Sequence, residues 1–147
     1  RLSHADVVLA RESPSCRLWV ESRSHIGPPP VKAAMLLDLQ ESWRKQLTDM
    51  QEVRQWEDLV SGQVAQFVEA TGSIDQRVVR RLGGIFTYAG YVYHVVGEAE
   101  EAEFEAARPE LEYALKTVRL LPAPIVNTPS ATHRFTGSAF EYSLEAP

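Results

Sequence analysis

The chain has 147 residues, of which 44% are hydrophobic and 24% are charged, the balance of an ordinary globular protein rather than a disordered one. This length is typical of one domain with a substantial core. The formal net charge of −5 argues against nucleic acid and anionic lipid as partners, because both require a basic surface. The apolar runs are shorter than the roughly 20 residues needed to cross a bilayer, so we expect no membrane span in this chain.

The sequence contains neither a signal peptide pattern nor a set of paired cysteines. No basic segment followed by an apolar one opens the chain, so we expect no signal peptide within it. Cys16 is the single cysteine, which excludes an intrachain disulfide and a cysteine-rich metal site. We interpret it as a structural thiol at the beginning of a strand.

The first third of the chain predicts two strands followed by a helix. The strands are expected at residues 5–10 and 16–21, since apolar residues alternate with Arg17, Trp19 and Glu21 in the second one. A helix is predicted over residues 31–47, after a proline-rich loop, and Trp43 should be buried against the sheet. The apolar stripe that carries this prediction consists of Leu36, Leu39, Trp43, Leu47 and Met50.

Residues 52–99 predict an antiparallel meander of about four strands. After a strand at residues 63–70, a turn is expected at residues 71–73. A long strand over residues 77–88 should bend or bulge at Gly83-Gly84. A two-residue turn at Ala89-Gly90 then leads into a returning strand at residues 91–96.

A second helix is predicted to begin near residues 107–108. This start places Pro109 in the first turn, where its missing N–H group is harmless, and Leu111 and Leu115 on one stripe. We divide the chain into an α+β domain at residues 1–121, a linker at residues 122–138 and a strand at residues 139–147. An antiparallel sheet with the two helices packed on one face is the expected architecture.

The order of these segments resembles the PsbP-like superfamily, which includes the extrinsic photosystem II protein PsbP and small bacterial envelope lipoproteins. The residues that carry the resemblance are the strand pair ADVVLA and CRLWVE, the striped helix, the segment from Ile85 to Val96, and the ending Leu115–Leu121. Members usually begin with a further strand, and the alternating residues 140–147 look like that strand displaced to the end. Three hypotheses stay open, in which this strand begins a second repeat, completes the sheet by permutation, or is unrelated. Exchange of the strand between two chains would give a swapped homodimer.

No catalytic motif is present in the sequence. His4, His25, His94 and His133 lack the spacing of metal ligands, and no nucleophile elbow or phosphate-binding loop occurs. We therefore expect a protein that is not an enzyme and that needs no metal or cofactor.

Two groups of residues are candidates for a surface that binds a partner. Arg77, Arg80 and Arg81 form a basic cluster that could recognise a carboxylate or phosphate, although most such clusters are solvated faces. Trp19 and Trp56 lie opposite the apolar sets of their strands and could form an aromatic patch.

The resemblance implies a non-enzymatic, envelope-associated domain that binds an unidentified protein partner, located in the periplasm or cell envelope. The alternative is a small-molecule carrier, or an accessory domain of a larger enzyme, with an apolar pocket between helix and sheet. A void between helix and sheet would favour this alternative, and long side chains filling that space would argue against it.

Overall fold

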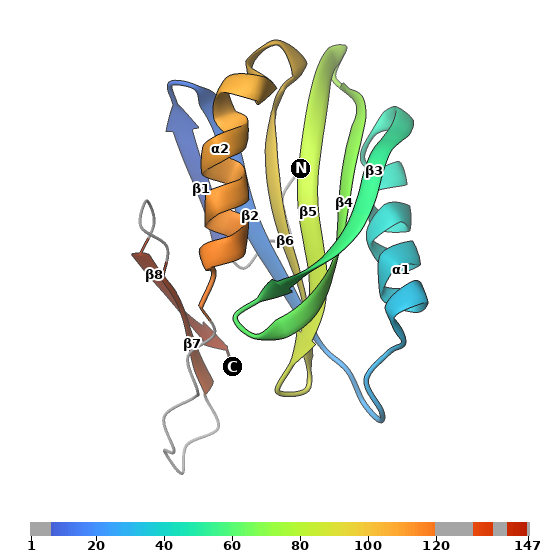
Figure 1. Ribbon diagram of the computed structural model, residues 1–147, viewed down its shortest axis with the longest axis vertical. Coiled ribbons are helices and arrows are strands. Elements are labelled where there is room, and N and C mark those ends of the chain that lie inside the picture. Colours follow the sequence, from blue (N-terminus) through green and yellow to red (C-terminus); the bar gives the residue numbers. More distant parts are fainter. Residues whose placement is uncertain (1–6, 120–130, 137–140, 147) are drawn as a thin grey trace.

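The computed structural model describes residues 7–119, 131–136 and 141–146, and its main feature is a six-stranded antiparallel sheet with the order β1-β2-β6-β5-β4-β3 (Figure 1). Within these residues the chain forms two helices, α1 (Lys32–Arg44) and α2 (Glu101–Thr117). The predicted α+β architecture, an antiparallel sheet with two helices packed on it, is confirmed. The strands of the sheet are β1 (Val7–Glu12), β2 (Ser15–Ser24), β3 (Thr48–Val60), β4 (Gln63–Ile74), β5 (Arg77–Tyr88) and β6 (Tyr91–Glu100).

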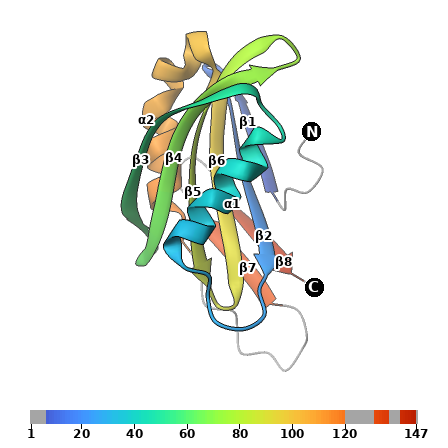
Figure 2. The ribbon, with the colours of Figure 1, turned by 90° about the vertical axis from the view of Figure 1, so that its right-hand side faces the viewer.

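The two helices pack on opposite faces of the sheet, so the prediction that they share one face is wrong (Figure 2). Leu39 and Trp43 of α1 join one buried cluster with Ile85, whereas Phe104 of α2 joins a second cluster with Phe86. Neighbouring residues of a strand project to opposite faces. Since the central strands carry apolar side chains on both faces, each face requires its own helix as a cover.

The glycine pair in β5 admits an aromatic ring from each face instead of forming the predicted bulge. Pairing with β4 and β6 keeps a regular register across Gly83 and Gly84. A β-carbon at Gly83 would lie 2.6 Å from Cζ2 of Trp43, and one at Gly84 would lie 2.8 Å from Cε1 of Phe67. The glycines are therefore required for packing rather than for a bend in the strand.

The turns of the meander are partly as predicted. The turn at Ala89-Gly90 is confirmed, with positive φ at both residues, as a tight two-residue hairpin requires. The expected turn at residues 71–73 is wrong, because β4 continues to Ile74 and the chain reverses at Asp75 and Gln76, which both have positive φ. Aspartate tolerates this left-handed conformation better than most residues.

Helix α2 contains Pro109 in its interior, so the predicted start near residues 107–108 is wrong. The missing N–H group of Pro109 leaves one helical hydrogen bond unmade. The buried stripe nevertheless continues on both sides of the proline, from Phe104 and Ala107 to Leu111. We attribute the continuity of the helix to the burial of this stripe against the sheet.

The C-terminal segment forms a separate two-stranded sheet from β7 (Ala131–Thr136) and β8 (Glu141–Ala146). Strand β8 pairs with β7 and not with the six-stranded sheet. Of the three hypotheses, the one in which this strand completes the main sheet by permutation is therefore excluded. Part of the predicted linker is thus a strand. A second repeat and a swapped homodimer stay predictions. Residues 5–6, 139–140 and 147 of the predicted strands lie outside the described residues.

Candidate functional site

The predicted partner surface is divided between the core and the two faces. Trp19 and Arg81 are each only 2% exposed and lie under α1, so neither contributes to a surface. The Arg81 guanidinium carbon is 5.1 Å from the centre of the Trp19 ring and 5.9 Å from that of Trp43. The alternation along β2 correctly placed Trp19 on the face opposite Leu18, but α1 covers that face.

A buried ion pair explains why Arg81 is tolerated in the interior. Its Nε donates to Oε2 of Glu98 at 2.6 Å, and both side chains are 2% exposed. Nη1 of Arg81 donates to Oε1 of Gln46 at 2.9 Å, and Glu98 also accepts a hydrogen bond from Arg17. Burial lowers the pKa of Arg81, while the Glu98 carboxylate acts in the opposite direction. This pair joins β5 to β6 beneath α1, and we assign it to stability.

The other two arginines lie on different faces, as the two-residue period of β5 requires. Arg77 is largely exposed and pairs with Glu100 at 3.2 Å on the same face as Arg81. Arg80 projects toward α2, where it pairs with Glu101 and Glu105. The three arginines therefore do not form one basic surface.

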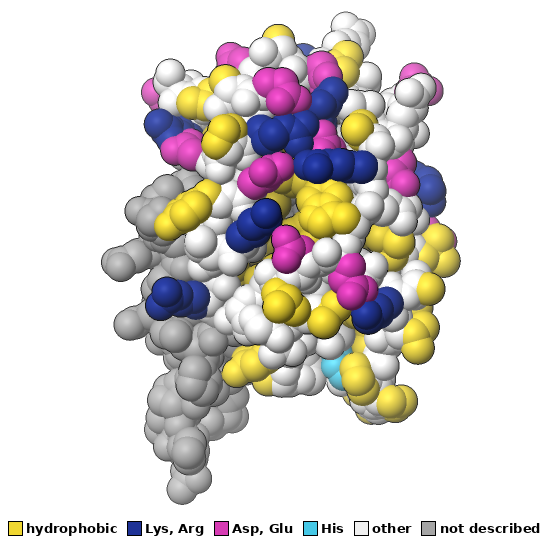
Figure 3. Space-filling view, in the orientation of Figure 1, with side chains coloured by type: hydrophobic (Ala, Val, Ile, Leu, Met, Phe, Trp, Pro, Cys, Tyr) yellow, Lys and Arg dark blue, Asp and Glu magenta, His cyan; other side chains and the backbone are white. Residues whose placement is uncertain are grey.

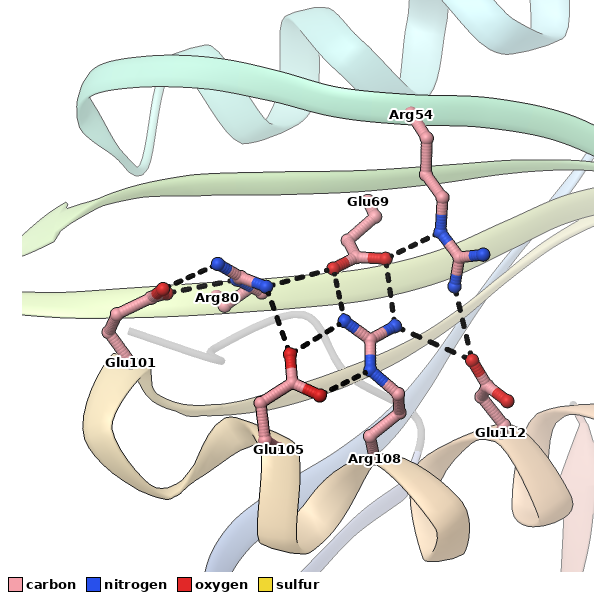
Figure 4. A network of polar contacts seen from close by, with 7 residues as sticks. All are labelled: Arg54, Glu69, Arg80, Glu101, Glu105, Arg108 and Glu112. Atoms are coloured by element: carbon pink, nitrogen blue, oxygen red, sulfur yellow. Dashed lines mark hydrogen bonds and ion pairs between the residues drawn. The ribbon is translucent and has the colours of Figure 1, made fainter.

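Glu69 of β4 is the centre of a network of ion pairs on the α2 face (Figure 4). Its carboxylate is only 1% exposed and accepts hydrogen bonds from three arginines. Arg54 donates at 2.7 Å, Arg108 at 2.8 and 3.0 Å, and Arg80 at 3.3 Å. These arginines come from β3, α2 and β5, so one buried carboxylate joins three elements to β4.

The outer carboxylates of this network belong to α2. Glu105 accepts from Arg108 at 3.0 Å, and Glu112 accepts from Arg54 at 3.1 Å. Burial opposes ionisation of Glu69, but hydrogen bonds from Arg108 and Arg54 outweigh it and the pKa of Glu69 is lowered. Hydrogen bonds to Glu69 and Glu105 raise the pKa of Arg108. The hydrogen bonds of the network hold the side chains of the arginines at defined positions.

A groove between β3 and α2 adjoins this network. Its floor is the stack of Trp56 on Phe67, with ring centres 5.3 Å apart and nearly parallel planes. The guanidinium of Arg54 lies 4.3 Å from the centre of the Trp56 ring, within the range of a cation–π contact. Trp56 remains partly exposed. The hollow measures about 110 Å³ and is lined by Arg54, Trp56, Phe67, Leu82, Glu112, Leu115 and Lys116.

The surroundings of the groove suit an extended, acidic and apolar segment. Figure 3, in the orientation of Figure 1, shows apolar side chains in the middle of this face, with charged side chains above them. The cations Arg54 and Lys116 line the groove with Glu112, and Lys116 also lies 3.7 Å from the exposed carboxylate of Asp58. An exposed pair of this kind contributes little free energy, so Lys116 can turn to a carboxylate of a partner. Strand β3 is an edge strand of the described sheet, and such an edge offers backbone groups to an incoming strand.

Sequence reasoning identified Trp56 and Arg80 but missed Glu69, Arg54 and Arg108. The available signal was Glu69 itself, a lone carboxylate inside the otherwise apolar and neutral run QVAQFVEA. A buried acid in such a strand requires a cationic partner.

No metal centre was found among the described residues, since no three histidine, cysteine or acidic side chains there are arranged to hold an ion. His25 lies in the loop after β2, and His94 lies on β6 facing α1. His4 and the side chain of His133 fall outside the described part of the structure. Within that part, no helix is long and apolar enough to span a bilayer.

Comparison with known proteins places the fold but no activity. A protein of unknown function from Pseudomonas aeruginosa, PA94, described as a putative regulator, is similar with a TM-score of 0.62 and 18% identity, over 78% of this chain and 76% of that one. LpqN of Mycobacterium tuberculosis, involved in cell envelope biogenesis, has a TM-score of 0.52 and 13% identity, over 73% of this chain and 63% of LpqN. The chain thus spans less than two thirds of LpqN. No family model and no curated protein sequence matches the chain.

Proposed function

We propose that this chain is a non-enzymatic domain that binds an extended segment of a protein partner in the groove between β3 and α2. The observation that carries the proposal is the stack of the partly exposed Trp56 on the buried Phe67, beside an arginine that a buried carboxylate fixes in place. Aromatic and arginine side chains that are already fixed before the partner binds are typical of the residues that dominate binding energy in protein interfaces. Because little side-chain freedom remains to be lost, such a surface binds at a low entropic cost.

The chemistry of the partner segment follows from the lining of the groove. An aromatic or aliphatic side chain would stack in the hollow over Phe67 and Leu115. A neighbouring aspartate or glutamate would face Arg54 and Lys116. Backbone groups of the same segment would pair with the free edge of β3.

The alternative, a carrier with an apolar pocket between helix and sheet, has less support. The hollow between α2 and the sheet is about 110 Å³, whereas sites for drug-sized ligands are commonly at least 300 Å³. A larger cavity of about 320 Å³ lies beside α1, but mainly polar and charged side chains line it, so it is not the apolar pocket that this alternative requires. Phe104, Leu111 and Leu115 fill the adjoining space under α2.

An envelope location is part of the proposal. It rests on the similarity in fold to LpqN, a protein of cell envelope biogenesis, together with the resemblance of the segment order to the PsbP-like superfamily. We propose that the chain belongs to this superfamily and acts in the periplasm or cell envelope.

Selection of peptides from a random library displayed on phage tests the binding mode. We expect the selected peptides to combine an aromatic or aliphatic residue with a nearby acid. Trp56→Ala should weaken their binding at least 10-fold, as removal of an interface anchor commonly does. Tyr113→Ala, which removes an exposed aromatic side chain of α2 that does not line the groove, should leave binding unchanged. Peptides that bind both variants equally well would contradict the proposal.

A further inference from the structure

A second cavity lies on the opposite face of the sheet, between α1 and the strands β2 and β6. It measures about 320 Å³ and is separate from the groove proposed above. Helix α1 covers β3, β4 and β5, so the sheet beside it is left open on this face. The cavity is lined by Glu21, Ser22, Arg23, Asp38, Glu41, Ser42, Lys45, Val92 and His94.

His94 is the most enclosed polar group of this cavity. The residue is 8% exposed, and its Nε2 atom is buried without a hydrogen-bond partner. That atom lies 3.3 Å from Oδ2 of Asp38, outside the alignment of a hydrogen bond, and Nδ1 lies 3.9 Å from Oε2 of Glu21. A buried nitrogen without a partner loses its hydration without compensation, so this position favours a ligand that supplies the missing contact.

The groups around His94 are mainly acceptors. Burial lowers the pKa of His94 despite the opposing effect of Asp38 and Glu21, so the imidazole is neutral at pH 7. A neutral imidazole has one nitrogen that accepts and one that donates. Two carboxylates beside it bring negative charge to the base of the cavity.

The cations of the cavity lie farther out. Arg23 pairs with Asp38, and its side chain is 59% exposed. An exposed ion pair of this kind contributes little free energy, so Arg23 can be displaced from Asp38 by a better partner.

We propose that this cavity binds an alkylammonium group, which donates to Nε2 of His94 and to the carboxylates of Asp38 and Glu21. An ammonium group has three donors and no acceptor, and its charge is opposite to that of the two carboxylates. In the structure Asp38 pairs with Arg23, and Glu21 accepts a hydrogen bond from Nε1 of Trp19. A hydroxyl group offers a single donor and no charge. The ammonium could come from a free amine or from a lysine side chain of a protein.

Titration of the protein with n-butylammonium chloride, observed through the His94 ring signals in NMR, tests this proposal. We expect a saturable shift at constant ionic strength, and no saturable shift with 1-butanol, the neutral compound of the same length. Asp38→Asn should weaken binding at least 10-fold. Glu57→Gln, which removes an exposed carboxylate of β3 outside the cavity, should leave the dissociation constant unchanged.

Two further arms complete the experiment. If Asp38→Asn lowers the melting temperature, Glu21→Gln replaces it as the test of the acceptor set. Nα-acetyl-lysine methylamide distinguishes the sources, because it binds as well as n-butylammonium if the cavity accepts a lysine of a protein, and more weakly if only a free amine fits. Equal shifts with n-butylammonium and 1-butanol, or equal binding by the wild type and both variants, would overturn the proposal.

Discussion

The two faces of the sheet both contain buried charge, but they use it differently. Beneath α1, Arg81 and Glu98 are both almost fully enclosed and satisfy each other. On the α2 face only the carboxylate of Glu69 is enclosed, while Arg54, Arg80 and Arg108 reach from it to the surface. We assign the closed pair to the stability of the core, although Arg17, which contacts Glu98, is itself exposed. The open network also fixes the positions of side chains that a partner can contact.

This difference explains where a site can form on each face. On the α2 face, Arg54 is one of the three arginines that contact Glu69, and it also covers Trp56, so the network and the groove share a residue. On the α1 face, Trp19 and Trp43 are sealed in the core, and the accessible part is the polar cavity beside the helix. The α2 face therefore presents aromatic surface, and the α1 face presents acceptors.

Removal of the aromatic centre of the α1 face should have the largest effect on stability. Trp43 is 2% exposed, and Trp43→Ala should lower the free energy of unfolding by about 3–5 kcal/mol, because a large cavity opens against Gly83. Chemical denaturation measures this change. The exposed control Tyr113→Ala should cost less than about 0.5 kcal/mol. A loss below about 1 kcal/mol for Trp43→Ala would show that α1 does not cover this face as described.

Breaking the ion pair of Arg81 and Glu98 should lower the free energy of unfolding nearly as much as Trp43→Ala does. Glu98→Gln leaves Arg81 charged in the interior without its counterion, and we expect a loss of about 3 kcal/mol. The exposed Glu100→Gln on the same strand should cost less than about 0.5 kcal/mol. Both values come from denaturant unfolding at pH 7. Equal effects of the two variants would mean that Glu98 is solvated.

A substitution in the open network should lower the free energy of unfolding by less, and the loss should depend on pH. Glu69→Gln should cost about 1–2 kcal/mol at pH 7, since the arginines keep water and other carboxylates as partners. The pKa of Glu69 is lowered in the folded protein, so its contribution is present above the ordinary glutamate pKa of about 4.3 and is lost as the pH falls through the folded value. The difference between wild type and variant should therefore shrink below about pH 4. A difference that grows on acidification would contradict this assignment.

Truncation of the C-terminal two-stranded sheet should have the smallest effect on the stability of the domain. Deleting residues 138–147 removes β8, which pairs with β7 and with no strand of the six-stranded sheet. We expect the melting temperature to change by less than about 2 °C, as for a change of a few tenths of a kcal/mol. A larger drop would show that the segment stabilises the main sheet.

Local patterns in the sequence predicted most elements but not their assembly. The bounds of β5, the turn at Ala89-Gly90 and the burial of Trp43 follow from residue periods and turn chemistry, and all three are confirmed. The two-residue period also separated Trp19 from Leu18 correctly. It could not show that both faces are covered, because coverage depends on where each helix packs, and Trp19 was therefore assigned to the surface.

The candidate site was only partly predictable for the same reason. Trp56 was identified from its strand, and Arg54, two positions earlier on β3, shares its face through the two-residue period. Phe67 becomes a neighbour of Trp56 only through the register of β3 with β4. Arg108 reaches Glu69 across 39 positions of the chain. Contacts of this kind are set by tertiary structure, which a single sequence does not reveal through periodicity.

Site-specific photo-crosslinking in the native host tests the central claim, binding of a protein partner in the groove, most directly. A benzoylphenylalanine at position 116 lies on the rim of the groove, and one at position 31 replaces an exposed valine that lines neither the groove nor the cavity beside α1. We predict a covalent adduct with one protein from position 116 only, which Trp56→Ala abolishes and Tyr113→Ala preserves. Equal adducts from both positions, or an adduct that persists in Trp56→Ala, would contradict the account.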